Sequence, residues 1–130
     1  RDGTIDAVAT DHAPHTEEEK ARGMLLAPSG MVGLETSLAL ALTYLYRDEG
    51  FALEDIIRLM STAPARILGI PKGTLAEGAD ADIVIFDPEA KWNVDAKKFV
   101  SMGRNTPFDG MRLTGRVRCT IAGGKTVYKK

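Results

Sequence analysis

The sequence predicts an α/β fold in which a β/α half comes first and an antiparallel β half follows. Three observations lead to this prediction. Residues 5–10 form a short apolar run rich in small and β-branched side chains. Two later stretches repeat apolar residues with the period of a helix. Near the end, two alternating segments flank Gly123-Gly124, which is the pattern of a hairpin.

The first half begins with the strand predicted over residues 5–10, which should be buried. Thr16 followed by Glu19 is a capping box, so a short acidic helix is expected to start there and to end at Gly23. Residues 32–46 carry only a thin polar stripe. They predict a helix that is buried on several sides.

Further along, apolar residues at spacings i, i+3, i+4 and i+7 predict an amphipathic helix over residues 53–61. Pro64 suits the first turn of a separate short helix, which Gly69 would end. After residue 70, glycines and aspartates punctuate a strand at residues 83–86, and residues 117–121 form the first arm of the hairpin. We therefore expect a boundary between residues 1–70 and residues 71–130.

Composition excludes several functional classes. The 130 residues carry a net charge of −1, which does not favour nucleic acid or an anionic membrane as a partner. The apolar uncharged stretch at residues 36–46 is shorter than the ~20 residues of a membrane-spanning helix. A single cysteine, Cys119, fits a reducing cytoplasm. Arg1 stands where a methionine would start a complete chain, so we expect a piece of a longer protein.

The candidate chemistry lies directly after the first strand, where Asp11, His12 and His15 form the pattern D-H-x-x-H. Carboxylate oxygen and imidazole nitrogen are suitable ligands for a divalent metal. Adjacent side chains in an extended segment point to opposite faces, so only Asp11 is expected to be a ligand. His12 would then be structural and His15 would reach the bound molecule. The alternative is an aspartate that caps backbone N–H groups beside two solvated histidines.

Two other loops have alternative interpretations. Ser29 and Gly30 could belong to an ordinary loop, or their main chain could approach a substrate closely. Residues 105–110 are rich in turn formers, which by itself indicates only a tight connection.

Several of these segments together resemble the dihydroorotases, which are metal-dependent members of the amidohydrolase superfamily. The resemblance lies in residues 5–20, 33–36, 64–69, 73–86, 105–110, 115–117 and 123–125. It implies the last strand and helices of a (β/α)₈ barrel in residues 1–70. It further implies part of a small β-sandwich domain, with a C-terminal tail, in residues 71–130.

The same resemblance implies roles for single residues. Asp11 would contact a zinc ion (Zn²⁺) and act as general base and acid. His15 would contact the substrate α-carboxylate, while main-chain groups of Ser29 and Gly30 would hold the ring. The implied reaction is the reversible cyclisation of N-carbamoyl-L-aspartate to L-dihydroorotate in pyrimidine biosynthesis.

Two other functions remain open from the sequence. One is a different cyclic-amide hydrolase, similar to allantoinases or hydantoinases. The other is a non-catalytic scaffold subunit, for example beside aspartate transcarbamoylase. In each case we expect a homo-oligomer, and we expect the 130 residues alone to be inactive because the remaining metal ligands would lie elsewhere.

Overall fold

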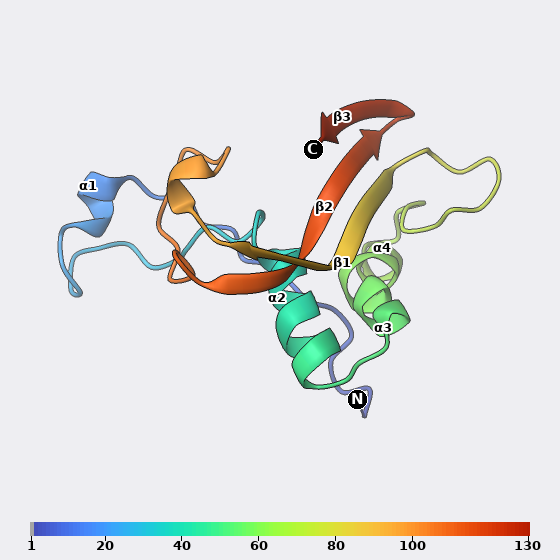
Figure 1. The fold of residues 1–130 in the computed structure, drawn as a ribbon, viewed down its shortest axis with the longest axis horizontal. Helices are drawn as coiled ribbons and strands as arrows, with labels where there is room; N and C mark the ends of the chain where they lie inside the picture. The colour runs from blue at the N-terminus through green and yellow to red at the C-terminus, as the bar shows by residue number, and fades with distance from the viewer. Residues whose placement is uncertain (1) are drawn as a thin grey trace.

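The computed structural model describes residues 2–130 and has its helices on one side of a small antiparallel sheet (Figure 1). The N-terminal half supplies every helix except one short 3₁₀ helix, and an extended arm that carries the first helix reaches away from the rest of the molecule. The elements, in chain order, are α1 (Glu17–Lys20), α2 (Ser37–Leu40), the π-helical η1 (Ala41–Asp48), α3 (Leu53–Ile57), the π-helical η2 (Arg58–Thr62), α4 (Ala63–Leu68), β1 (Ile83–Asn93), the 3₁₀ helix η3 (Ala96–Lys98), β2 (Arg112–Ala122) and β3 (Lys125–Lys129).

The sheet has the strand order β1-β2-β3, with both pairs antiparallel. The turn predicted at Gly123-Gly124 is confirmed, and both glycines have positive φ angles. β1 is longer than the strand predicted over residues 83–86, because β2 accompanies it across an irregularity between Asp87 and Lys91. Strand length is thus set by the partner strand rather than by the local apolar run.

The helix predicted over residues 32–46 begins later, at Ser37, and runs through α2 and η1 to Asp48. The preceding residues are bound to other segments. Val32 donates its N–H to the carbonyl of Asn105 at 3.1 Å, and Gly33 donates to Nδ1 of His12 at 3.0 Å. These long-range bonds hold residues 32–34 outside the helix.

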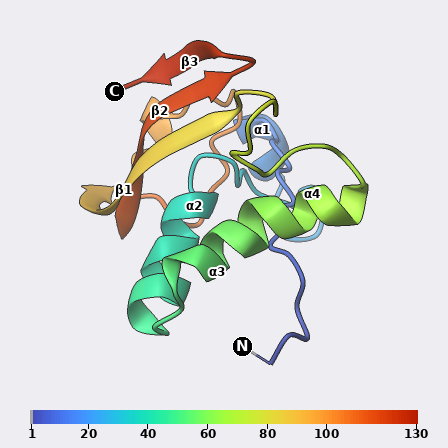
Figure 2. The ribbon, with the colours of Figure 1, turned by 90° about the vertical axis from the view of Figure 1, so that its right-hand side faces the viewer.

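Residues 53–68 form one continuous helical run, α3-η2-α4, where the sequence predicts two separate helices (Figure 2). Pro64 lies at the start of α4 and has no N–H, and the wider π-helical turn of η2 directly precedes it. Gly69 ends the run at φ 65°, as expected. The capping box of α1 is confirmed, although this helix ends at Lys20 and not at Gly23.

The buried strand predicted over residues 5–10 is wrong for this structure. Ile5 is 71% exposed. Val8 donates to the carbonyl of Leu59 at 3.0 Å, and a single parallel bridge joins His12 and Met31. A strand needs a neighbouring strand for its ladder of hydrogen bonds, and none of the three strands in residues 2–130 lies beside this segment.

The core joins the two halves of the chain. Leu42 and Ile56 are buried between the helices, while Leu113 of β2 packs with residues from the first half. Thr43 links the helix layer to β2. Its hydroxyl accepts a hydrogen bond from the N–H of Thr114 at 2.8 Å and donates one to the carbonyl of Ala39 at 2.7 Å. Within this chain, the two halves on either side of the boundary expected near residue 70 therefore share a core.

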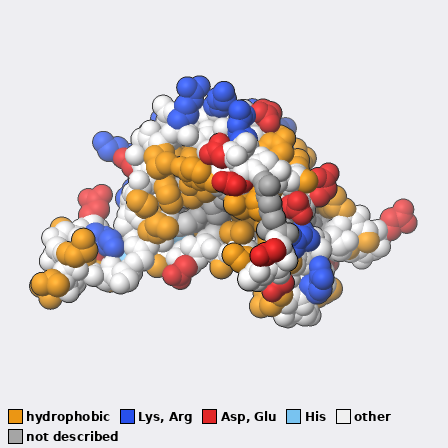
Figure 3. Space-filling view, turned by 90° about the horizontal axis from the view of Figure 1, so that it is seen from below, with side chains coloured by type: hydrophobic (Ala, Val, Ile, Leu, Met, Phe, Trp, Pro, Cys, Tyr) orange, Lys and Arg blue, Asp and Glu red, His pale blue; other side chains and the backbone are white. Residues whose placement is uncertain are grey.

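Hydrophobic side chains remain exposed on the face seen from below and at the outer end of the α1 arm (Figure 3). On the arm, Met24 and Leu25 are each more than nine-tenths exposed. Even so, no helix within residues 2–130 has the length and apolar character to cross a membrane.

Candidate functional site

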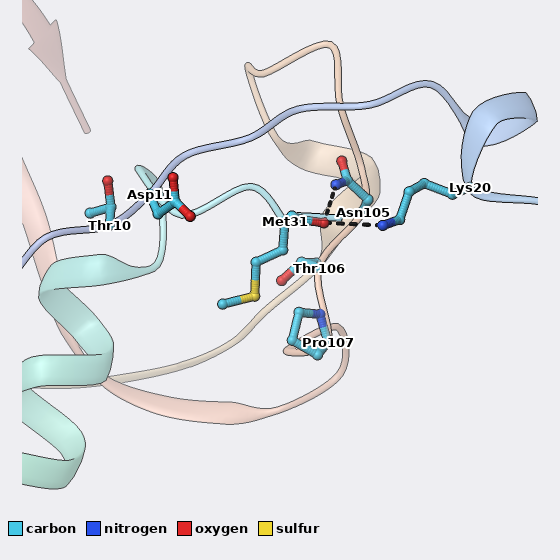
Figure 4. A pocket seen from close by; sticks show the side chains of 8 residues that line it. Thr10, Asp11, Lys20, Met31, Asn105, Thr106 and Pro107 are labelled. Atoms are coloured by element: carbon cyan, nitrogen blue, oxygen red, sulfur yellow. Dashed lines mark hydrogen bonds between the residues drawn. The ribbon is translucent and has the colours of Figure 1, made fainter. Parts of the chain in front are cut away.

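Asp11 lines an open pocket of about 620 Å³ at the junction of three loops (Figure 4). It is the one non-glycine residue with positive φ among residues 2–130, at 43°. This backbone region is uncommon for a residue with a side chain and is tolerated best by Asp and Asn. The other lining residues are Thr10, Lys20, Gly30, Met31, Asn105, Thr106 and Pro107.

His12 serves a structural purpose on a different side of the same segment. Its Nδ1 accepts hydrogen bonds from the N–H groups of Gly33, at 3.0 Å, and Leu34, at 3.4 Å. An accepting Nδ1 carries no proton, so any ring proton is on Nε2. The expected division between Asp11 and His12 therefore agrees with the geometry: Asp11 lines the pocket and His12 binds the backbone before α2.

His15 lies beside the pocket and is tied to the second loop. Its Nε2 is 2.9 Å from the carbonyl oxygen of Ser29, which can only accept, so Nε2 donates. Its Nδ1 is 3.7 Å from a carboxylate oxygen of Glu19. The hydrogen bond from the backbone N–H of Thr16, together with the nearby His15, lowers the pKa of Glu19. Glu19 is thus an anion that holds the start of α1 next to the histidine.

Gly30 is required by the close approach of the second loop to the first. Its φ is 112°, and a Cβ there would lie 2.5 Å from the Cβ of Ala13. Its carbonyl accepts from Nζ of Lys20 at 3.1 Å, and Lys20 also donates to the carbonyl of Pro28 at 2.9 Å. Of the four site residues expected from the sequence, Asp11 and Gly30 line the pocket, while His15 and Ser29 bind each other at its side.

Asn105 is a pocket residue that the sequence did not single out. Its side chain contacts both loops, with hydrogen bonds to the N–H of His15 and to the carbonyls of Ala13 and Gly30, each 3.1 Å long. Figure 4 draws one of these bonds, from Asn105 to the Gly30 carbonyl, together with the bond from Lys20 to the same oxygen. In the sequence, Asn105 was noted only as the first residue of 105–110, which is a run of turn formers and one of the segments that resemble the dihydroorotases.

Among Asp11, His12 and His15, the structure favours Asp11 as the side chain that would bind a metal ion. Residues 2–130 contain no cluster of three or more His, Cys, Asp or Glu side chains. His12 uses Nδ1 for the backbone, and His15 uses Nε2 for Ser29. Asp11 has no hydrogen bond that would occupy its carboxylate among the described contacts, and it lines the pocket. A metal ion would fit here with Asp11 as a single ligand and its other ligands from outside these residues.

Comparison with known proteins matches residues 1–127 to the amidohydrolase family. The chain is 49% identical to a dihydroorotase of Clostridium botulinum over 128 residues, which are 98% of this chain and 31% of that protein. It is 55% identical to a dihydroorotase of Pelotomaculum thermopropionicum, again over 98% of this chain and 30% of the relative. The chain therefore spans about a third of the length of these curated relatives.

Solved structures show the same similarity in three dimensions. An L-hydantoinase (dihydropyrimidinase) from Arthrobacter aurescens aligns with a TM-score of 0.89 and 38% identity, covering 98% of this chain and 30% of that one. The dihydropyrimidinase from Brevibacillus agri NCHU1002 aligns with a TM-score of 0.90 and 28% identity, covering 98% of this chain and 29% of that one. The family match over nearly every residue shows that the chain belongs to the amidohydrolase family.

Proposed function

We propose that the full-length protein is a zinc-dependent dihydroorotase that interconverts N-carbamoyl-L-aspartate and L-dihydroorotate in pyrimidine biosynthesis in the cytoplasm. The observation that carries the proposal is the position of Asp11, whose carboxylate lines a pocket while its neighbour His12 is turned to the backbone. Identity of 49% and 55% to proteins named dihydroorotase supports this choice of substrate.

The architecture that we propose for this function has parts of two domains. Residues 1–70 would form the last strand and helices of a (β/α)₈ barrel, and residues 71–130 would contribute to a small β-sandwich. The structural similarity to hydantoinases and dihydropyrimidinases, with TM-scores of 0.89 and 0.90, supports the first part. The exposed sides of β1 and β3 leave room for further strands of a sandwich.

In the proposed mechanism, Asp11 is a metal ligand and the proton carrier. A divalent metal ion held by Asp11 and by ligands from outside these residues would lower the pKa of a water molecule, which would make that water a stronger nucleophile at neutral pH. For ring opening, the Asp11 carboxylate accepts the proton of the attacking water and passes it to the departing amide nitrogen. For ring closure the same steps run in reverse: the Asp11 carboxylate takes the proton of the attacking nitrogen and returns it to the oxygen that leaves as water. General acid–base catalysis of this kind typically contributes 10²- to 10⁴-fold.

His15, Ser29 and Gly30 would bind the substrate. His15 would donate a hydrogen bond to the α-carboxylate, and main-chain groups of Ser29 and Gly30 would contact the ring. In this structure Nε2 of His15 is bonded to Ser29, so a contact through Nε2 would replace that bond. The Gly30 carbonyl already accepts from Lys20 and Asn105, which favours its N–H as the group offered to substrate.

A different cyclic-amide hydrolase is the second candidate. The structural similarity to hydantoinases and dihydropyrimidinases, with TM-scores of 0.89 and 0.90, favours it. The reaction class is the same, and the pocket bounded by Asp11, Lys20 and Asn105 would then accept a neutral ring in place of a substrate with carboxylates. A non-catalytic scaffold subunit has less support, because Asp11 and His15 are both present.

An assay of the purified full-length protein tests the proposal. With zinc supplied, it should cyclise N-carbamoyl-L-aspartate at mildly acidic pH and open L-dihydroorotate at alkaline pH. Turnover of hydantoin or dihydrouracil in place of dihydroorotate would establish the second candidate, and no turnover of any of them would support the scaffold. Size-exclusion chromatography, with and without aspartate transcarbamoylase, would test the proposed homo-oligomer and that partner. The 130-residue chain serves as the inactive control.

A further inference from the structure

We propose that Asn105 is a positioning residue that sets the geometry of both substrate loops, a role that rests on the proposed function. The first loop is residues 11–15, which begins with Asp11, and the second loop is residues 28–31. We call Asn105 with its three partners, Ala13, His15 and Gly30, the Asn105 clamp. It brings the second half of the chain, 75 to 92 residues away, into the site.

The side-chain amide of Asn105 uses both of its ends. The oxygen accepts from the N–H of His15, and the nitrogen donates to the carbonyls of Ala13 and Gly30. An amide has two donor hydrogens, so both are used. An Asp side chain at position 105 would lack the two N–H donors, and a Leu side chain would lack both the donors and the acceptor. Only an amide can make all three hydrogen bonds.

The main chain around Asn105 places the amide in the junction. The Asn105 carbonyl accepts from the N–H of Val32 at 3.1 Å, and the N–H of Ala13 donates to the carbonyl of Met31 at 2.8 Å. A Cβ at Gly103 would lie 2.8 Å from the Cβ of Pro14, so the chain before Asn105 also packs closely on the first loop. Three segments therefore meet here, and the Asn105 side chain is bonded to two of them.

The clamp has a direct effect on the pocket. The Gly30 carbonyl receives donors from Lys20 and Asn105, which fixes the orientation of the Gly30 peptide. The bond to His15 fixes the backbone from which its imidazole projects. Both residues are proposed substrate contacts, whereas none of the three hydrogen bonds of the Asn105 side chain goes to Asp11. Loss of the clamp should therefore weaken substrate binding more than it slows the chemical step.

The test uses Asn105→Asp and Asn105→Ala in the full-length zinc-loaded protein. Asp is nearly isosteric, keeps the acceptor for His15 and places an anion against two carbonyl oxygens. We expect KM for N-carbamoyl-L-aspartate to rise at least tenfold in both variants, with kcat within about threefold of wild type. Asn93→Asp is the matched control: it makes the same change at an exposed position of β1 and should leave both constants unchanged.

Hydrogen exchange of the His15 amide gives a second measurement that does not need the reaction. Asn105→Ala should speed this exchange, whereas Asn105→Asp should keep it slow because the acceptor oxygen remains. Unchanged KM in both variants, or unchanged His15 exchange in Asn105→Ala, would overturn the positioning role. A fall in the active fraction with normal KM would also overturn it, because that result indicates a purely structural residue. An inactive wild-type protein would instead refute the proposed function, and exchange would still test the clamp.

Discussion

The sheet and the site loops are held together in different ways. β1, β2 and β3 are bonded through antiparallel ladders with a few irregularities, so each strand depends on many similar contacts. Residues 11–15 and 28–31 have one bridge between them and depend on single side chains, above all His12, Lys20 and Asn105. The difference implies that one substitution can change the site without unfolding the sheet. Another substitution can destabilise the sheet without changing the site.

Glycines show the same contrast. Gly115 of β2 lies against the helix layer, where an added Cβ would be 3.0 Å from the Cβ of Leu42. Gly30 and Gly33 instead lie against the first site loop, near Ala13 and Thr10. Glycine in the sheet therefore serves packing between layers, and glycine near the pocket serves the approach of loops.

The largest expected effect is on the site alone. Asp11→Asn in the full-length protein should lower turnover at least 100-fold, because the amide cannot accept and return the proton. The fold should persist, since Asn also tolerates a positive φ. Steady-state kinetics with a thermal melt would measure both. Asp6→Asn, at an exposed position of the same segment, is the matched control. Near-normal turnover of Asp11→Asn would exclude the carboxylate from the mechanism.

The next effect should fall on stability alone. Gly115→Ala should lower the free energy of unfolding by about 1–3 kcal/mol, because the methyl group overpacks against Leu42. Gly110→Ala isolates the backbone strain, since Gly110 has φ 77° and no atom within 4 Å of an added Cβ. Denaturant titration of the full-length protein checks this. Equal losses in the two variants would show that strain, and not packing, is responsible.

His15→Ala should have a smaller effect, and this effect should fall on substrate binding by the loops. We expect KM for N-carbamoyl-L-aspartate to rise about tenfold, which corresponds to one hydrogen bond of about 1.4 kcal/mol. The thermal midpoint should change little, since the ring is tied only to Ser29 and Glu19 among the described contacts. Unchanged affinity would contradict the proposed contact with the carboxylate.

The smallest effect should come from the ion pairs before β1. Nζ of Lys72 lies 2.7 Å from Asp80 and 2.5 Å from Asp82, all of them solvent-exposed. Hydrogen bonds from Lys72 and from the N–H of Gly123 lower the pKa of Asp82 below its ordinary 3.8. The ionised carboxylate therefore stabilises the fold above pH 3.8, and this contribution is lost as pH falls through the lowered pKa.

Thermal melts of wild type and Lys72→Met across pH measure that contribution. The difference between the two midpoints should be small at pH 7 and should shrink as the pH is lowered past 3.8. Lys125→Met, at an exposed position in the hairpin, is the control. A difference that grows on acidification would contradict the predicted sign.

Local signals were sufficient for several elements. The Thr16–Glu19 capping box, the helix end at Gly69 and the hairpin at Gly123-Gly124 each depend on residues within a few positions. The split between Asp11 and His12 was also predicted, but from an extended backbone, whereas Asp11 has a φ of 43°. The assignment of residues 5–10 as a strand failed within this chain because a strand requires a partner, which no local pattern supplies.

The sequence by itself determined the family and the candidate site: residues 1–127 match the amidohydrolase family, and a carboxylate and two imidazoles lie close together in residues 11–15. Only the tertiary structure decided which groups share the pocket. The continuous helix through Pro64 and the contact of Asn105 with two loops depend on bonds between distant residues. Such bonds form only when packing of the helices and the sheet brings distant residues together. The spacing of residues along the sequence does not give their distance in space.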